Sequence, residues 1–119
     1  MTRSRVSARQ AGSKFERATA DYLASEVDDR IDRRVKTGNK DRGDVGGLRA
    51  HGSRVTVECK DTSKIEVGTF LAEVEVERGN DDGLAGVVVA KRRGKRDPAD
   101  ALVLMTLRDL VALITGVRP

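Results

Sequence analysis

Apolar and small residues recur with the period of a helix from about Ala11 onwards. The positions i, i+3, i+4, i+7 and i+8 form one face of a helix. Here they are Phe15, Ala18, Thr19, Tyr22 and Leu23. Ser13 and Glu16 have the spacing of a capping box, which favours a helix that begins at this point. Residues 1–10 carry three arginines among small polar residues and predict a flexible basic arm ahead of the helix.

Three short strands are expected next. Apolar and charged residues alternate around Ile31–Lys36, and a second strand is expected over Asp44–Ala50, although Gly46 and Gly47 weaken it. The third is Arg54–Lys60, and the two residues before Ser53 suit a tight hairpin turn. Strand alternation sends Val55, Val57 and Cys59 to one face and Thr56, Glu58 and Lys60 to the other.

The second half of the chain predicts a helix, two strands and a last helix. The helix spans about Val67–Arg78, with an apolar stripe at Val67, Phe70, Leu71 and Val74 and a stop at Gly79-Asn80. The continuous apolar run Ala85–Ala90 is typical of a strand buried on both faces. A basic loop over residues 91–100 leads to a second buried strand at Ala101–Met105. Thr106 caps the last helix, whose stripe is Leu107, Leu110, Val111 and Ile114.

The order is therefore helix, three strands, helix, strand, strand, helix. A crossover helix between the third and fourth strands implies at least one parallel pair. The expected fold is a single α/β domain over residues 11–119, with a mixed central sheet and helices on both faces.

Composition adds limits on what this domain can do. The chain has 119 residues, which suits one domain, and 35% of them are charged. With no Trp, one Tyr and two Phe, it has little with which to stack nucleic-acid bases. The net charge of +4 favours polyanions, although solubility alone explains such a value equally well.

The compartment is expected to be cytoplasmic. Cys59 is the only cysteine, so no disulfide can form within the chain. No apolar stretch approaches the roughly 18 residues that span a bilayer, and the N-terminus lacks the apolar run of a signal peptide.

Candidate chemistry emerges when the predicted hairpin is folded about His51-Gly52. Facing residues then have numbers that sum to 102 or 103, so Asp44 lies across from Glu58 or Cys59. Lys60 shares the face of Glu58. Two adjacent carboxylates repel each other unless a cation lies between them, and Mg²⁺ prefers such oxygen ligands. The alternative is a surface hairpin with a salt bridge from Lys60 to Asp44 or Glu58, and spacing alone favours it.

A resemblance to a known family favours the metal site over the surface salt bridge. Gly43-Asp44 followed by Val55-Thr56-Val57-Glu58-Cys59-Lys60 resembles the signature of the PD-(D/E)XK nuclease superfamily, an Asp at a strand start and Glu-X-Lys ending the next strand. Gly12–Arg17 resembles the opening of archaeal-type Holliday junction resolvases and their phage relatives, and residues 86–100 are similar to phage proteins of that group. The resemblance covers roughly residues 13–114.

The resemblance implies a restriction-endonuclease-like core and a role for each site residue. Asp44 and Glu58 would ligate the metal together with the backbone carbonyl of Cys59, and Lys60 would assist the attacking water. Glu16 would complete the acidic site through a water or a second metal. Gly43 stands where the family name has Pro, and the second helix lacks the Gln that some branches use.

Two basic segments are candidates for contact with DNA phosphates. One is the loop cluster Lys91, Arg92, Arg93, Lys95 and Arg96. The other precedes the candidate site and comprises Arg33, Arg34, Lys36, Lys40 and Arg42. A solvated charge run is the simpler interpretation of the loop cluster. The acidic second helix is expected to face away from DNA, and a basic surface on a partner subunit is a candidate to pair with it.

Two reactive residue types have simpler interpretations. His51 is the only histidine and is expected to be a turn residue. Cys59 is expected to be a small core residue without a nucleophilic role, because no other Cys or nearby His would activate it.

The expected function is that of a Mg²⁺-dependent DNA endonuclease, with Mn²⁺ as a substitute, that resolves four-way junctions. Symmetric cutting of a junction needs two sites, so a homodimer is expected. One alternative is a restriction-type or repair nuclease of the same superfamily. The other is a non-catalytic DNA-binding module that keeps the fold.

Overall fold

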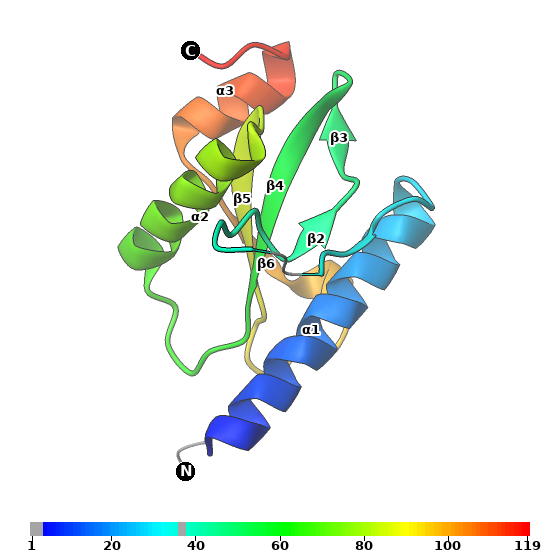
Figure 1. Ribbon diagram of the computed structural model, residues 1–119. Helices are drawn as coiled ribbons and strands as arrows, with labels where there is room; N and C mark the ends of the chain where they lie inside the picture. The colour runs from blue at the N-terminus through cyan, green and yellow to red at the C-terminus, as the bar shows by residue number, and fades with distance from the viewer. Residues whose placement is uncertain (1–3, 36–37) are drawn as a thin grey trace.

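The computed structural model describes residues 4–35 and 38–119. Its centre is a mixed sheet in the order β1-β2-β4-β5-β6, and β3 extends the hairpin with β4 (Figure 1). The strands are β1 (Asp32–Arg33), β2 (Val45–Gly46), β3 (Arg49–Ala50), β4 (Ser53–Lys60), β5 (Ala85–Ala90) and β6 (Leu102–Leu104). Among these strands, β4 and β5 pair in parallel and the other pairs are antiparallel. The predicted α/β class with a mixed sheet is confirmed.

The first helix, α1 (Arg5–Glu26), begins six residues earlier than the sequence pattern suggested. Its N-cap is Ser4, whose side chain accepts a hydrogen bond from the backbone N–H of Ser7. Ser13 is therefore an interior residue of the helix and does not cap it, and residues 5–10 are helical. The apolar stripe marked only the part of the helix that packs on the sheet. The earlier turns are exposed, and Figure 1 shows them extending past the sheet.

The first two predicted strands are shorter than expected. The strand expected over Ile31–Lys36 is limited to β1, and Lys36 lies outside the described residues. The strand expected over Asp44–Ala50 is divided into β2 and β3 by a bulge at Gly47. Val45 pairs with Val57, and Arg49 pairs with Arg54. The segment that contains β2 and β3 therefore uses four residue steps between these pairs where β4 uses three, so it carries one extra residue. Gly47 has a φ of +91°, and a Cβ there would lie 2.9 Å from the carbonyl oxygen of Arg30. The bulge therefore requires glycine.

The turn between β3 and β4 is the predicted one. Ala50 pairs with Ser53, and the two residues between them, His51 and Gly52, both have positive φ, as a type I′ turn requires. The ring of His51 hydrogen-bonds to the backbone carbonyl of Leu113. This contact supports the interpretation of His51 as a structural turn residue.

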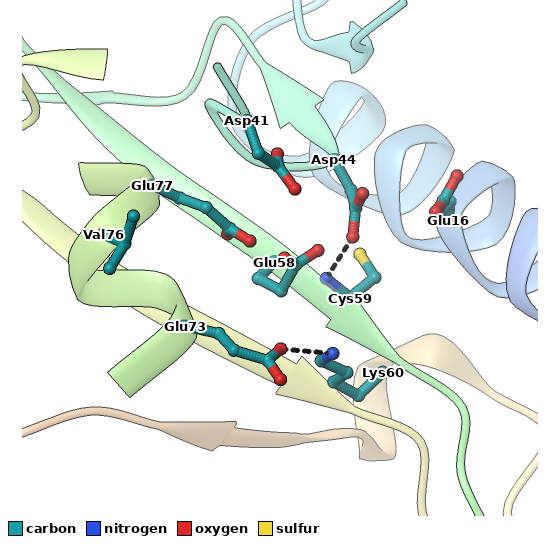
Figure 2. A pocket seen from close by; sticks show the side chains of 9 residues that line it. All are labelled: Glu16, Asp41, Asp44, Glu58, Cys59, Lys60, Glu73, Val76 and Glu77. Carbon is teal, nitrogen blue, oxygen red and sulfur yellow. Dashed lines mark hydrogen bonds and ion pairs between the residues drawn. The ribbon is translucent and has the colours of Figure 1, made fainter. Parts of the chain in front are cut away.

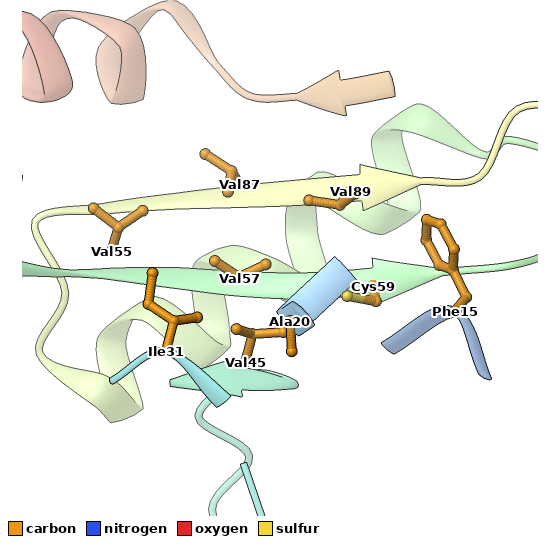
Figure 3. Packing of buried hydrophobic residues seen from close by; sticks show 9 residues of the cluster. All are labelled: Phe15, Ala20, Ile31, Val45, Val55, Val57, Cys59, Val87 and Val89. Atoms are coloured by element: carbon orange, nitrogen blue, oxygen red, sulfur yellow. The ribbon is translucent and has the colours of Figure 1, made fainter. Parts of the chain in front are cut away.

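Alternation along β4 separates the interior into two cores. Val55, Val57 and Cys59 face α1 and pack with Phe15 and neighbouring residues (Figure 3). On the opposite face, α2 (Val67–Asp81) places Phe70 and Val74 against Val88 of β5. Every residue of β5 is buried, as predicted from its continuous apolar run. Glu58 and Lys60 therefore point to the face of the sheet that α2 covers.

The C-terminal elements depart from the sequence prediction in which side chains they bury. Thr106 caps α3 (Leu107–Thr115), as expected, and a short 3-10 helix, η1 (Pro98–Asp100), precedes β6. The predicted apolar stripe of α3 nevertheless faces solvent, and the helix buries Asp109 and Ala112 instead. Asp109 accepts hydrogen bonds from the N–H of Gly86 and from Arg118, so its carboxylate is satisfied inside the fold. The strand predicted at Ala101–Met105 is present as β6, but its predicted burial was wrong, because Val103 is 53% exposed.

None of the helices in the described part of the chain is long and apolar enough to cross a membrane.

Candidate metal centre

An open pocket lies at the carboxyl end of β4, between α1, the loop before β2 and α2 (Figure 2). Its lining is dominated by carboxylates. The lining residues are Glu16, Asp41, Asp44, Glu58, Cys59, Lys60, Glu73, Val76 and Glu77. All four predicted catalytic residues, Glu16, Asp44, Glu58 and Lys60, are therefore brought together at one pocket.

The bulge at Gly47 sets the register that brings Asp44 to Glu58. Val45 faces Val57 in the core, and the N–H of Asp44 donates to the carbonyl oxygen of Val57 at 2.7 Å. Continuing the register by one residue places Asp44 opposite Glu58, which was one of the two predicted pairings. Without the extra residue, Asp44 would oppose Cys59, and Val45 would leave the core.

Gly43 has a conformational reason to differ from the proline of the family name. Its φ is +96°, whereas proline is held near −65°. A Cβ at this position would also lie 2.7 Å from the backbone oxygen of Val57. In this chain only glycine brings the backbone of Asp44 this close to β4.

Asp44 is buried and held in place by the backbone of β4. Its Oδ2 accepts a hydrogen bond from the N–H of Cys59 at 2.8 Å. The carbonyl of Lys60 points towards β5, where it accepts from the N–H of Lys91. Because neighbouring carbonyls in a strand point to opposite sides, the carbonyl of Cys59 points to the Asp44 side, past the end of β2. This is the orientation that the predicted backbone ligand needs.

Three carboxylates from three segments meet beside Asp44. Oxygen atoms of Asp41, Glu58 and Glu77 all lie within 4.8 Å of one another, which is close enough to hold a metal ion. Glu58 also lies opposite Asp44 when the Val45↔Val57 register is continued by one residue. An all-oxygen ligand set of this kind fits a hard divalent cation.

Burial shifts the protonation of the two glutamates in this group. It raises the pKa of Glu58 to about 8 and that of Glu77 to about 7, both from an ordinary value of 4.5. The neighbouring negative charges of Asp41 and, for Glu77, Asp44 act in the same direction. In the absence of a cation the pocket therefore retains protons near neutral pH.

Lys60 is oriented by α2. Its ammonium forms an ion pair with Glu73 at 2.6 Å and lies 5.1 Å from the ring centre of Phe70. Burial works to lower the pKa of Lys60, but the hydrogen bond with Glu73 and the charge of Glu58 raise it above its ordinary value. Lys60 is thus a positive charge fixed at the rim of the pocket. The alternative considered from the sequence gave Lys60 a cross-strand partner in Asp44 or Glu58, whereas the ion pair in the structure is with Glu73 of α2.

Several predicted DNA contacts are engaged within the fold. Arg33 pairs with Glu16 at 2.9 Å, and Arg34 pairs with Asp81 at 2.7 Å, where Asp81 also accepts a hydrogen bond from Thr56. Arg33 and Arg34 therefore have structural partners, while Lys40 and Arg42 are exposed and Lys36 lies outside the described residues. The loop cations Lys91, Arg92, Arg93, Lys95 and Arg96 are all exposed.

The acidic second helix was expected to face away from DNA, and two of its residues nevertheless lie at the candidate site. Glu73 and Glu77 lie on the face of α2 that lines the pocket. A signal for Glu77 was present, because it follows Phe70 and Val74 at positions i+7 and i+3 of the buried stripe. Asp41 had no comparable signal, because a loop has no period that would orient its side chains.

Cys59 is buried, and burial raises the pKa of its thiol to about 12. Its side chain belongs to the core that faces α1, which supports the expected structural role.

No family model matches this chain, and no curated protein or solved structure gives a match to it. Inference about its function therefore depends on the geometry and chemistry of the site.

Proposed function

We propose that this protein is a Mg²⁺-dependent DNA endonuclease with a restriction-endonuclease-like core of the PD-(D/E)XK type. The observation that carries the proposal is a pair of buried carboxylates at the carboxyl end of β4. Glu58 is on β4 itself, Asp44 reaches it from the residue before β2, and Lys60 follows Glu58 by two residues. The order of helices and strands agrees with such a core.

The residues suit the roles that the resemblance implies. Asp44, Glu58 and the carbonyl of Cys59 would hold the metal, with Glu16 reaching the same pocket from α1. A bound divalent cation lowers the pKa of a coordinated water and polarises a phosphoryl oxygen. Lys60, held by Glu73, supplies a fixed positive charge where negative charge develops on the phosphate.

The proposed substrate is DNA, and the preferred form is the four-way junction. The exposed loop cations at residues 91–96 follow β5, whose end pairs with the end of β4. The phosphate backbone of DNA would therefore meet positive charge close to the pocket. Among the described cations of the other segment, Lys40 and Arg42 are exposed, whereas Arg33 and Arg34 form ion pairs.

The direct test is cleavage of labelled four-way junction, flap, linear duplex and single strand, with and without Mg²⁺. The wild type is expected to cut the junction only with Mg²⁺, and Asp44→Asn is expected to cut nothing. A strong preference for linear duplex would favour the restriction-type or repair alternative. Binding without any metal-dependent cleavage would favour the non-catalytic module.

A second copy of the chain is the proposed partner, and α3 presents the surface for it. The exposed face of α3 is apolar, with Leu107 76% and Ile114 67% exposed. A two-fold contact places a patch against its own copy, so an uncharged apolar face can associate with itself where a charged one would repel. β6 is an edge strand of the sheet, and a two-residue connection joins it to this helix.

Ile114→Asp is expected to convert a dimer into a monomer while leaving the fold intact, because the side chain is outside the core. Sedimentation measurements at micromolar concentration check this. Val6→Asp, at an exposed position of α1, is the matched control and should remain dimeric. A wild type that is monomeric under these conditions would contradict the assignment.

A further inference from the structure

We propose that the pocket binds a second divalent cation, held by Asp41, Glu58 and Glu77, so that Glu58 lies between two metal positions. The first position is the one formed by Asp44, Glu58 and the carbonyl of Cys59. This inference rests on the proposed function, and it adds two ligands that do not belong to the sequence signature.

The geometry separates the two positions. Asp44 lies on the β2 side of Glu58, where its carboxylate accepts from the N–H of Cys59. Glu77 approaches Glu58 from α2, and Asp41 closes the group from the loop, with all three oxygens within 4.8 Å of one another (Figure 2). Glu58 lies opposite Asp44 in the strand register and also belongs to the group with Asp41 and Glu77, so one carboxylate can serve both positions.

Glu77 itself points to a missing partner. The side chain is only 5% exposed, and its Oε2 is buried without a hydrogen-bond partner among the described residues. Burying a carboxylate oxygen without a partner costs free energy, so buried polar groups generally have a hydrogen-bond partner, a water or an ion. Its location in the Asp41, Glu58 and Glu77 group makes a cation the group that would satisfy it.

The C-terminal end of α2 positions both additional ligands, Glu77 and Asp41. The side chain of Asn80 donates to the backbone oxygen of Asp41 at 2.8 Å, and Asn80 lies one turn after Glu77 on α2. The Oδ1 of Asp41 accepts from the N–H of Gly43, which orients the carboxylate. The loop and the helix therefore present their carboxylates as one preorganised group.

The charge of the pocket is suited to two dications. Six carboxylates line it, and two of them, Glu16 and Glu73, pair with Arg33 and Lys60. The other four belong to Asp41, Asp44, Glu58 and Glu77, and Lys60 is the one basic residue among the described residues of the lining. Pairs of cations bridged by a carboxylate stabilise both the attacking and the leaving oxygen in phosphodiester hydrolysis. The substrate class implied is thus a phosphodiester whose scissile phosphate lies over Glu58.

The test counts Mn²⁺ bound to the full chain without DNA, by equilibrium dialysis and by the magnetic coupling between neighbouring ions in electron paramagnetic resonance. Wild type is expected to bind two coupled ions. Glu77→Gln is expected to bind one, with affinity for the second reduced by at least about tenfold. Glu66→Gln removes the same charge from the exposed N-cap of α2 and should still bind two.

A wild type that saturates with one ion, or a Glu77→Gln variant that binds two coupled ions with unchanged affinity, would overturn the second position. If Glu77→Gln fails to fold, as judged by thermal melting, Asp41→Asn makes the same comparison from the loop. Mg²⁺-dependent cleavage is measured on the same preparations. If the wild type binds one ion and cleaves DNA, the second metal position is rejected and the proposed nuclease activity is retained. If it binds two ions and does not cleave, the second position is retained and the nuclease activity is rejected.

Discussion

Replacing Glu58 with glutamine is expected to reduce metal-dependent DNA cleavage by at least about a thousandfold. Glu58 is the carboxylate common to both proposed metal positions. Loss of a metal that stabilises the transition state by several kcal/mol corresponds to three or more decades of rate. Glutamine has the same shape, so the fold should persist. Single-turnover cleavage of the preferred substrate at saturating Mg²⁺ measures the effect.

Lys60→Met distinguishes the role of metal binding from the role of the Lys60 charge in stabilising the phosphate during cleavage. Lys60 pairs with Glu73 and supplies no carboxylate oxygen, so this variant should lose cleavage while still binding Mn²⁺. Glu58→Gln should lose both. Glu66→Gln, on the exposed N-cap of α2, should behave as wild type in both measurements. Cleavage by Glu58→Gln within about tenfold of wild type would place the chemistry elsewhere in the molecule.

Without divalent metal, the protein is expected to become less stable as the pH rises from about 5 to about 9. Burial raises the pKa of Glu58 to about 8 and that of Glu77 to about 7. A carboxyl group with a higher pKa in the folded state holds its proton more tightly there. Its contribution to stability is therefore complete below the unfolded value of 4.5 and is lost as the pH passes 7 and 8.

The expected loss amounts to a few kcal/mol, because one pKa unit corresponds to about 1.4 kcal/mol and neighbouring carboxyls that share a proton do not contribute independently. For a domain of this size, the melting temperature should fall by on the order of 10 °C. Thermal melting in a chelator across this pH range measures the effect. Saturating Mg²⁺ should restore stability at high pH, because a cation that binds only the folded state stabilises it.

Glu58→Gln provides the control for this linkage, because its side chain cannot ionise. Its melting temperature in chelator should depend less on pH than that of wild type and should gain less from Mg²⁺. A wild-type melting temperature that stays level or rises between pH 5 and 9 in chelator would contradict the assignment of buried carboxyls to this pocket.

The sequence anticipated the part of the site that lies on one strand and its hairpin partner. Alternation along β4 required Glu58 and Lys60 to share a face, because side chains in a strand alternate. The turn at His51-Gly52 limited Asp44 to one of two partners. Both inferences use only local backbone geometry, and the structure places these residues at one pocket as expected.

The same local rules misplaced other features. The period of α3 identified an apolar stripe, but periodicity cannot tell whether a stripe faces the core or a surface. Local rules also could not anticipate the ion pairs of Arg33 and Arg34, because their partners, Glu16 and Asp81, are distant in sequence and adjacent only in the fold. The acidic residues of α2 were treated as one group that faces away from DNA, although residues on different sides of a helix have different surroundings, and Glu73 and Glu77 line the pocket.

By itself, the sequence determined the three helices, the order of the main strands among them and the strand face that carries Glu58 and Lys60, because these follow from the periods of strands and helices. Only the tertiary structure decided the composition of the pocket. The bulge at Gly47 selected Glu58 as the residue opposite Asp44, and the packing of α2 on β4 brought Glu77 to the group. Such choices depend on contacts between segments far apart in the chain, and no local period records them.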